Sequence, residues 1–130
     1  MSKHLKVLGK GDAQLLGNVN VVRNFIMIAI ENLGMRPLGE ATIHDVELDI
    51  KKLNQEPFED EGGASIQLVG YNTLSTSHLA IHCWPFRDEF HLDIYSCRDF
   101  NKEYIINFIK EYFRCFKMKV SDLTYATEWD

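Results

Sequence analysis

Most of the side chains that could do chemistry in this sequence fall in two neighbouring segments, residues 75–85 and 89–97. The first contains Ser77 and His82, and the second ends in Cys97. Serine and cysteine can act as nucleophiles, and histidine is suited to moving protons near neutral pH. A nucleophilic pair of Cys97 and His82 is one interpretation, although no third residue that would orient the pair can be named. The plainer interpretation is a structural polar surface.

Histidine and cysteine are also metal ligands, and His78, His82 and His91 lie near Cys83 and Cys97 in the sequence. Four residues of an extended strand span about 13 Å, so His78 and His82 are too far apart to hold one ion. Cys83 and His82 are neighbours and face opposite sides of a strand. We therefore expect no metal site.

The elements that must position these residues are two predicted strands. Apolar residues alternate with polar or aromatic ones in both segments, which is the pattern of a half-buried strand: Leu79, Ile81 and Cys83, then Phe90, Leu92 and Ile94. The connection, residues 85–88, is short enough for a hairpin. Pairing the apolar faces places His82 and Cys97 together on the opposite face, because a one-residue slip would expose every apolar side chain.

The rest of the chain completes a single domain over residues 1–130. Further strands are predicted at residues 4–8, 41–50, 64–71 and 117–124, and helices from about residue 19 or 20 to 33 and from about 101 to 116. Residues 9–12 are expected to form a turn, and residues 51–63 an acidic loop. The order β-α-β-β-β-β-α-β predicts an α+β fold with a mostly antiparallel sheet and both helices on one face.

The uncovered face of such a sheet carries His82 and Cys97, so we expect a second copy or a ligand to cover it. A formal charge of -5 argues against nucleic acid and anionic membranes as partners. No apolar run reaches the roughly 20 residues of a membrane span. Three cysteines without scaffold-like spacing, and a first strand that begins without a signal peptide, indicate a cytoplasmic protein with reduced thiols.

Residues 76–85, Thr-Ser-His-Leu-Ala-Ile-His-Cys-Trp-Pro, resemble the Glu-Ser-His-x-x-Ile-His-Thr-Trp-Pro signature of bacterial S-adenosylmethionine decarboxylases. The family's proton-donating cysteine follows the signature serine by twenty residues, in an Asp-x-x-x-Cys segment that residues 93–97 match. His4-Leu5 and residues 11–16 are similar to the family's opening, and the order of elements also agrees. The resemblance implies the sandwich fold of that family and a homodimer in which two polar sheet faces meet.

The same resemblance implies self-cleavage between Thr76 and Ser77, which converts Ser77 into a pyruvoyl group and requires no metal. The ketone of that group forms a Schiff base with the substrate amine and accepts the electron pair released with CO₂. His82 would be the base in processing, and Cys97 the acid that protonates the product carbon. The substrate would be S-adenosylmethionine, and the product would feed spermidine synthesis.

Substrate binding is implied for His78, Trp84, Phe86 and Glu89, although the sequence departs from the family's pattern here. Phe86 replaces the glutamate that holds the substrate ribose, a role that Asp88 or Glu89 could take. Thr76 replaces the glutamate before the serine, and a second processing serine falls on Val69 unless a gap shifts it to Ser65. Two alternatives follow: a pyruvoyl decarboxylase of arginine or ornithine, or a non-processing homologue that serves as a binding or regulatory subunit.

Overall fold

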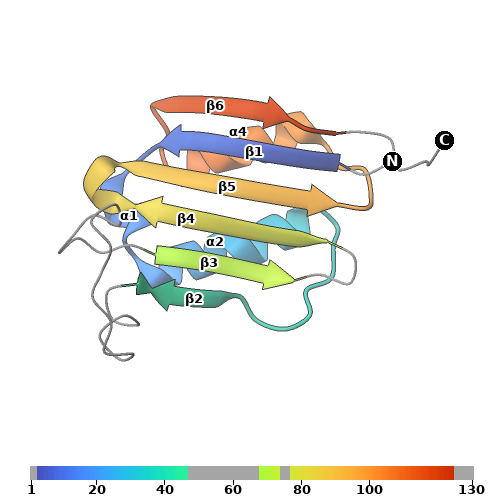
Figure 1. Cartoon of the computed structure of the whole chain (residues 1–130), viewed down its shortest axis with the longest axis horizontal. Helices are drawn as coiled ribbons and strands as arrows, with labels where there is room; N and C mark the ends of the chain where they lie inside the picture. The colour runs from blue at the N-terminus through green and yellow to red at the C-terminus, as the bar shows by residue number, and fades with distance from the viewer. Residues whose placement is uncertain (1–2, 47–67, 74–76, 125–130) are drawn as a thin grey trace.

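The computed structural model describes residues 3–46, 68–73 and 77–124 of the chain. Six strands in these ranges form one antiparallel sheet with the order β2-β3-β4-β5-β1-β6. Figure 1 shows the sheet in front of helices α2 and α4, which both lie behind it. The strands are β1 (Lys3–Lys10), β2 (Thr42–Asp45), β3 (Leu68–Thr73), β4 (His78–Trp84), β5 (Glu89–Ser96) and β6 (Lys117–Asp122). The predicted α+β class, with helices on one face only, is therefore confirmed.

The two long helices begin at asparagine caps. Asn18 accepts hydrogen bonds from the N–H groups at the start of α2 (Val19–Asn32), and Asn101 does the same for α4 (Lys102–Tyr112). These bonds satisfy donors that a helix start leaves unpaired. Gly34 follows α2 with a φ of 71°, the left-handed conformation that ends a helix at little cost to glycine.

The core lies between the helices and the inner face of the sheet. Phe25 of α2 packs on Phe113, whose ring also contacts Phe90 of β5. Every second residue of the central strands faces this layer and is buried: Leu5 and Val7 of β1, Leu79, Ile81 and Cys83 of β4, and Phe90, Leu92 and Ile94 of β5. Burying this apolar area is the main term that holds the sheet against the helices.

The first strand is longer than predicted. Residues 9 and 10, expected in a turn, pair with β5 and β6 as the end of β1. The strand needs a glycine at position 9, because the Phe90 ring occupies the space that a side chain would take. An atom of this ring lies 2.4 Å from where a Cβ of Gly9 would be. A close approach of two elements, rather than a turn, explains this glycine.

Two short helical segments add to the predicted order. These are α1 (Ala13–Leu16) and the 3-10 turn η2 (Pro85–Arg87), which forms the β4–β5 hairpin connection with Asp88 at a φ of 56°. Helix α4 ends at Tyr112, before the predicted residue 116. The strand predicted at 64–71 is found at Leu68–Thr73, and that predicted at 41–50 at Thr42–Asp45. Residues 47–67, including the acidic loop, lie outside the described residues. No helix among the described residues is long and apolar enough to cross a membrane.

Candidate active site

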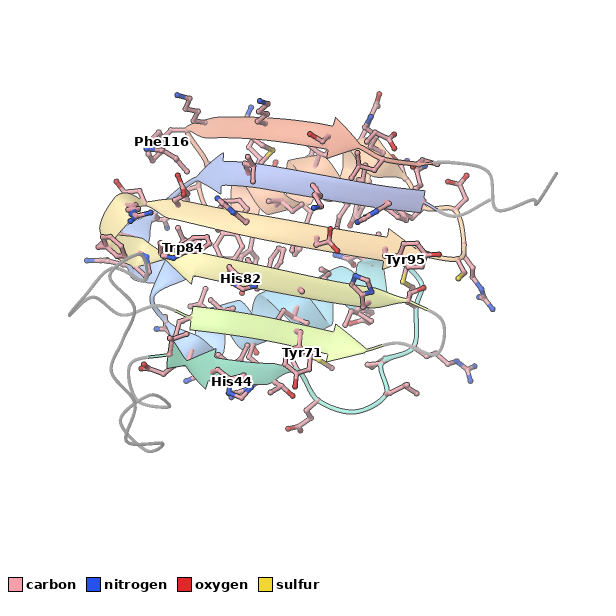
Figure 2. The ribbon with its side chains drawn as sticks, in the orientation of Figure 1. His44, Tyr71, His82, Trp84, Tyr95 and Phe116 are labelled. Atoms are coloured by element: carbon pink, nitrogen blue, oxygen red, sulfur yellow. The ribbon has the colours of Figure 1, made fainter. Side chains whose placement is uncertain are left out.

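The sheet face opposite the helices, here called the open face, collects the polar side chains of the central strands. Figure 2 shows His82 and Trp84 on β4 and Tyr95 near the far end of β5, all on this face. The strand registers place all five histidines of the chain on it: His4, His44, His78, His82 and His91. The inner face, by contrast, holds mainly apolar side chains.

Ser77 and Cys97 meet at the end of the hairpin where β4 begins and β5 finishes. The backbone N–H of Cys97 donates a hydrogen bond of 3.2 Å to the Ser77 Oγ. Cys97 is exposed and Ser77 half-buried. The structure therefore brings together the two residues expected to supply the pyruvoyl group and the proton. Thr76, on the other side of the expected cleavage point, lies outside the described residues.

A cluster of four side chains, here called the Asp93 cluster, lies at the same end of the open face. Nε2 of His4 lies 2.7 Å from one Asp93 oxygen, and Nε2 of His78 lies 2.9 Å from the other. The Tyr95 ring stacks on His78, with centroids 5.7 Å apart, and meets the edge of His4 at the same separation. Strands β1, β4 and β5 each contribute, so the cluster exists only in the folded sheet.

The Asp93 carboxyl is held in its ionised form. Partial burial raises its pKa, but hydrogen bonds from His78 and His4, together with their charge, outweigh burial and leave the pKa below its ordinary value. The carboxylate is thus a fixed negative charge between two imidazoles.

A second group of side chains, here called the Trp84 cluster, lies towards the other end of β4. The Trp84 ring stacks on His82 at 5.8 Å and meets His91 edge-on at 4.6 Å. Nε2 of His91 lies 3.2 Å from Glu89. The pKa of His82 is lowered, first because its charged form loses water among these rings and second because His91 lies opposite. A histidine that stays neutral at physiological pH can accept a proton.

His82 lies too far from Ser77 and Cys97 within one chain to act on the same atom as they do. His82 follows Ser77 by five residues, about 16 Å along an extended strand. His82 pairs with His91 on β5, and Cys97 lies six residues beyond His91. His82 and Cys97 are therefore about 20 Å apart along the sheet. A direct pair of Cys97 and His82 in one protomer is therefore wrong, since sharing a face fixes only the side of the sheet and not the position along it.

The predicted substrate residues divide between the two ends in the same way. His78 lies with Ser77, whereas Trp84, Phe86 and Glu89 lie at or beside the hairpin connection. The Phe86 side chain is 44% exposed, and the Arg87 guanidinium lies 4.9 Å from its ring centre.

A hollow of about 340 Å³ lies on the open face between the clusters. Its lining joins residues of both clusters to Lys6 and Leu8 of β1: His4, Lys6, Leu8, Ala80, His82, His91, Leu92 and Asp93. A volume of this order is within the range of small-molecule pockets. Among the described residues, no three histidine, cysteine or acidic side chains are arranged to hold a metal ion.

The other two cysteines are poorly suited to chemistry. Burial raises the pKa of Cys83 to about 12, and burial also raises that of Cys115 to about 11 despite the opposing charge of Lys110. Thiolate is the reactive form, so both thiols are inert at neutral pH.

Sequence reasoning missed His4 and Asp93 as site residues. Asp93 was recognised only as part of a spacing pattern, and His4 only as part of an opening motif. Both alternate with buried residues in their strands, which places them on a polar face. Their meeting depends on β1 pairing beside β5, a long-range register that alternation does not specify.

Comparison with known proteins identifies the family and the fold of this chain. The profile of the family described as S-adenosylmethionine decarboxylase matches residues 6–124. The crystal structure of the adenosylmethionine decarboxylase from Aquifex aeolicus is similar in fold, with a TM-score of 0.72 over 100% of this chain and 97% of that one, at 17% identity. Comparison with curated protein sequences finds no significant match. Because the family profile spans nearly the whole chain, including both strands that carry Ser77 and Cys97, the chain belongs to the S-adenosylmethionine decarboxylase family.

Proposed function

We propose that this chain is a self-processing decarboxylase of S-adenosylmethionine that uses a pyruvoyl group made from Ser77. The hydrogen bond between the Cys97 N–H and the Ser77 Oγ carries the proposal, because it joins the two residues that such an enzyme needs at one point. The product would serve spermidine synthesis in the cytoplasm. Proteins of this family generally depend on a pyruvoyl group, which supports the assignment.

The residues around Ser77 fit such a group. A pyruvoyl is a small ketone. Formed from Ser77, it would stand immediately before the start of β4. The Cys97 N–H donates to the Ser77 Oγ, so it can hold that oxygen in place before the hydroxyl attacks. When present, the group would supply a carbonyl that binds the substrate amine and withdraws the electron pair left by CO₂. Cys97, being exposed beside it, would donate the proton that completes the product.

Processing would begin when the Ser77 Oγ attacks the carbonyl of the preceding peptide bond and replaces the amide with an ester. Elimination of that ester would release the first fragment as a carboxylate and leave a dehydroalanine on the second fragment, and water would then convert the dehydroalanine to the pyruvoyl with release of ammonia. The chain would divide into 76 and 54 residues, which together account for all 130. These reaction steps need a base, and His82, whose lowered pKa favours the neutral imidazole, can accept the proton.

A homodimer would resolve the separation of His82 from Ser77. His82, Trp84, Phe86 and Glu89 cannot reach Ser77 of their own protomer, which lies about 16 Å or more away along β4. In a face-to-face dimer whose two-fold axis lies between the two open faces and runs across the strands, the Trp84 cluster of one protomer would lie opposite Ser77 and Cys97 of the other. Each site would then use residues of both chains.

Exposed apolar side chains on the open face support this arrangement. Two large apolar side chains of the open face are exposed: Leu8 of β1 by 43% and Tyr71 of β3 by 42%. The helices already cover the other face, so these side chains would be buried only by a second copy or a ligand.

The alternative is decarboxylation of a smaller amino acid such as arginine or ornithine. One observation favours it: Phe86, which stands where the family has its ribose-binding glutamate, is exposed and contacts Arg87. A phenyl ring cannot accept hydrogen bonds from a ribose diol. Glu89 lies two residues beyond the turn and would have to take that role. A non-processing homologue that acts as a binding subunit is the remaining alternative.

Intact mass spectrometry of freshly purified protein tests the proposal. We expect fragments of 76 and 54 residues, with the second blocked to N-terminal sequencing, and decarboxylation of S-adenosylmethionine. Ser77→Ala must abolish cleavage because alanine has no oxygen to attack with. Ser75, two residues away, offers a matched control, since Ser75→Ala should leave cleavage intact. An uncleaved chain after prolonged incubation, inactive on all three substrates, would favour the binding subunit.

A further inference from the structure

A second hollow, here called the lysine hollow, lies on the open face towards the edge of the sheet and has a volume of about 250 Å³. Its lining comes from β5, β1 and β6, and β6 is the outermost strand on that side (Figure 1). Three lysines belong to the lining, Lys10 of β1 with Lys117 and Lys119 of β6, together with one acidic residue, Glu89. The lining therefore carries an excess of two positive charges, and the proposed function uses none of these lysines.

The strand register brings the three lysines close together on one side of the sheet. Lys10 lies directly opposite Lys117, and Leu8, two residues earlier on the same face, lies opposite Lys119. Neighbouring strands are about 4.8 Å apart, and residues two positions apart on one strand are separated by about 7 Å. Like charges directly opposite each other destabilise a sheet, so the pair of Lys10 and Lys117 costs the fold free energy.

Among the described residues, no acidic side chain forms an ion pair with any of these three lysines. Glu89 lies in register with Lys10 on β5, but its carboxylate contacts Nε2 of His91 at 3.2 Å instead. Cationic side chains elsewhere on the surface do have acidic partners: Lys3 with Asp99, Lys102 with Asp122, and Arg114 with Asp12. The charges of the lysine hollow are thus available to a ligand.

The lining suits a compact anion with two negative charges. A phosphate monoester carries about 1.5 to 2 negative charges at pH 7 and has three strong acceptor oxygens, which matches three ammonium groups that can only donate. A carboxylate has a single charge and two oxygens. The volume is below the roughly 300–1,000 Å³ of pockets for drug-sized ligands, so the ligand is small. The chain as a whole has a formal charge of -5, so a generally basic surface does not explain the lysines.

We propose that the lysine hollow binds a phosphate group, either free or carried by a small monoester. Lys10, Lys117 and Lys119 donate hydrogen bonds to its oxygens, and the exposed Leu8 side chain contacts the organic part of a monoester. The bound anion offsets the repulsion between Lys10 and Lys117, whereas the Glu89 carboxylate opposes its binding. This site is separate from self-cleavage, so it does not rest on the proposed function.

Titration with inorganic phosphate measures the binding directly. The Ser77→Ala protein is suitable because it cannot cleave and so has one covalent form. At neutral pH, with ionic strength held constant by chloride, ¹H–¹⁵N spectra should show saturable shifts centred on Lys10, Lys117 and Lys119. Adenosine monophosphate and adenosine distinguish the sources of the phosphate. Tighter binding of the monophosphate than of phosphate supports a monoester as the ligand, and equal binding supports free phosphate.

Substitutions test whether these lysines form the site. Lys10→Gln should weaken phosphate binding by roughly fivefold or more, because it removes one charged contact. Lys6→Gln is the matched control, since Lys6 lies on the same strand and face but opposite Asp93 and outside the lining. It should change the affinity less than about twofold. Glu89→Gln should strengthen binding, because it removes the negative charge of the lining.

Three results would overturn the proposal. Equal weakening by Lys6→Gln and Lys10→Gln would show a diffuse effect of surface charge and not a site. Adenosine that binds as tightly as adenosine monophosphate would show that the phosphate group is not recognised. Shifts that do not saturate with millimolar phosphate would show that the lysine hollow holds no such ligand.

Discussion

His82 and His91 lie directly opposite each other on β4 and β5, and the Trp84 ring contacts both imidazoles. Two histidines in this arrangement resist carrying charge at the same time. The pKa of His82 is accordingly lowered, by burial first and by His91 second. The position therefore makes the stability of the fold depend on pH.

The first prediction is that acid destabilises the fold through His82. A lowered folded-state pKa means that the unfolded chain binds the proton more readily, so stability falls as pH drops through about 6.5, the unfolded value, towards the folded pKa. In the Ser77→Ala background, urea unfolding between about pH 7.5 and pH 5.5 should show a smaller loss of stability for His82→Gln than for the parent. His44→Gln should behave like the parent, and equal losses in all three proteins would contradict the assignment.

The second prediction concerns the dimer. Leu8→Asp places a charge on the open face, where Leu8 is 43% exposed and lines the hollow. Burying that carboxylate against a second copy is costly, so light scattering should show a monomer. Tyr104→Asp, at a 51% exposed position on α4, should remain a dimer. A wild-type monomer at micromolar concentration would contradict the proposed interface.

The third prediction concerns the choice of substrate. Phe86→Glu supplies the acceptor for a ribose diol, and a hydrogen bond to a charged group contributes about 1.5–3 kcal/mol. The ratio of kcat/KM for S-adenosylmethionine over ornithine should therefore rise by roughly ten- to a hundredfold. Arg87→Ala, which removes only the contact with the Phe86 ring, is the control. An already exclusive preference in the wild-type enzyme would indicate that Glu89 holds the ribose.

The fourth prediction concerns thiol reactivity. Cys97 is exposed, whereas Cys83 is fully buried with a pKa of about 12. Iodoacetamide at mildly alkaline pH should alkylate Cys97 first in the native protein, and Cys83 only after unfolding. Peptide mass mapping would identify the labelled thiol. Rapid native labelling of Cys83 would show that β4 opens on its inner side.

The fifth prediction tests the close approach of β1 and β5. Gly9→Ala would place a methyl group 2.4 Å from the Phe90 ring, and such overpacking typically costs about 1–3 kcal/mol. Thermal unfolding should show the corresponding fall in Tm. Ser121→Ala, an exposed position on the edge strand β6, should leave Tm nearly unchanged. An unaffected Gly9→Ala protein would mean that the Phe90 ring moves at little cost.

Local patterns were enough to predict the class of fold and the content of each face. Alternation in residues 78–84 and 89–96 predicted the hairpin and its buried side, since a slip of one residue would reverse both faces. The resemblance to the family assigned roles to Ser77 and Cys97, and the structure joins these two residues by a hydrogen bond.

Long-range pairing is what the sequence did not reveal. Alternation could not show that β1 lies between β5 and β6, and it therefore could not bring His4 to Asp93. The predicted pair of Cys97 and His82 was wrong for the same reason. Alternation shows which face of the sheet a side chain is on, whereas the distance between two side chains along that face depends on the strand register. Gly9 was misread as a turn residue since its real constraint, the Phe90 ring, comes from a strand 80 residues later.

The strand order has a consequence for the fate of a cleaved chain. A cut before Ser77 would assign β1, β2 and β3 to one product and β4, β5 and β6 to the other. Because β1 lies between β5 and β6, the first product would be threaded between two strands of the second, with all eight residues of β1 paired to β5. Strand β3 would remain bonded to β4 as well. The two polypeptides would thus stay together as one unfolding unit, to be separated by denaturant and not by dilution.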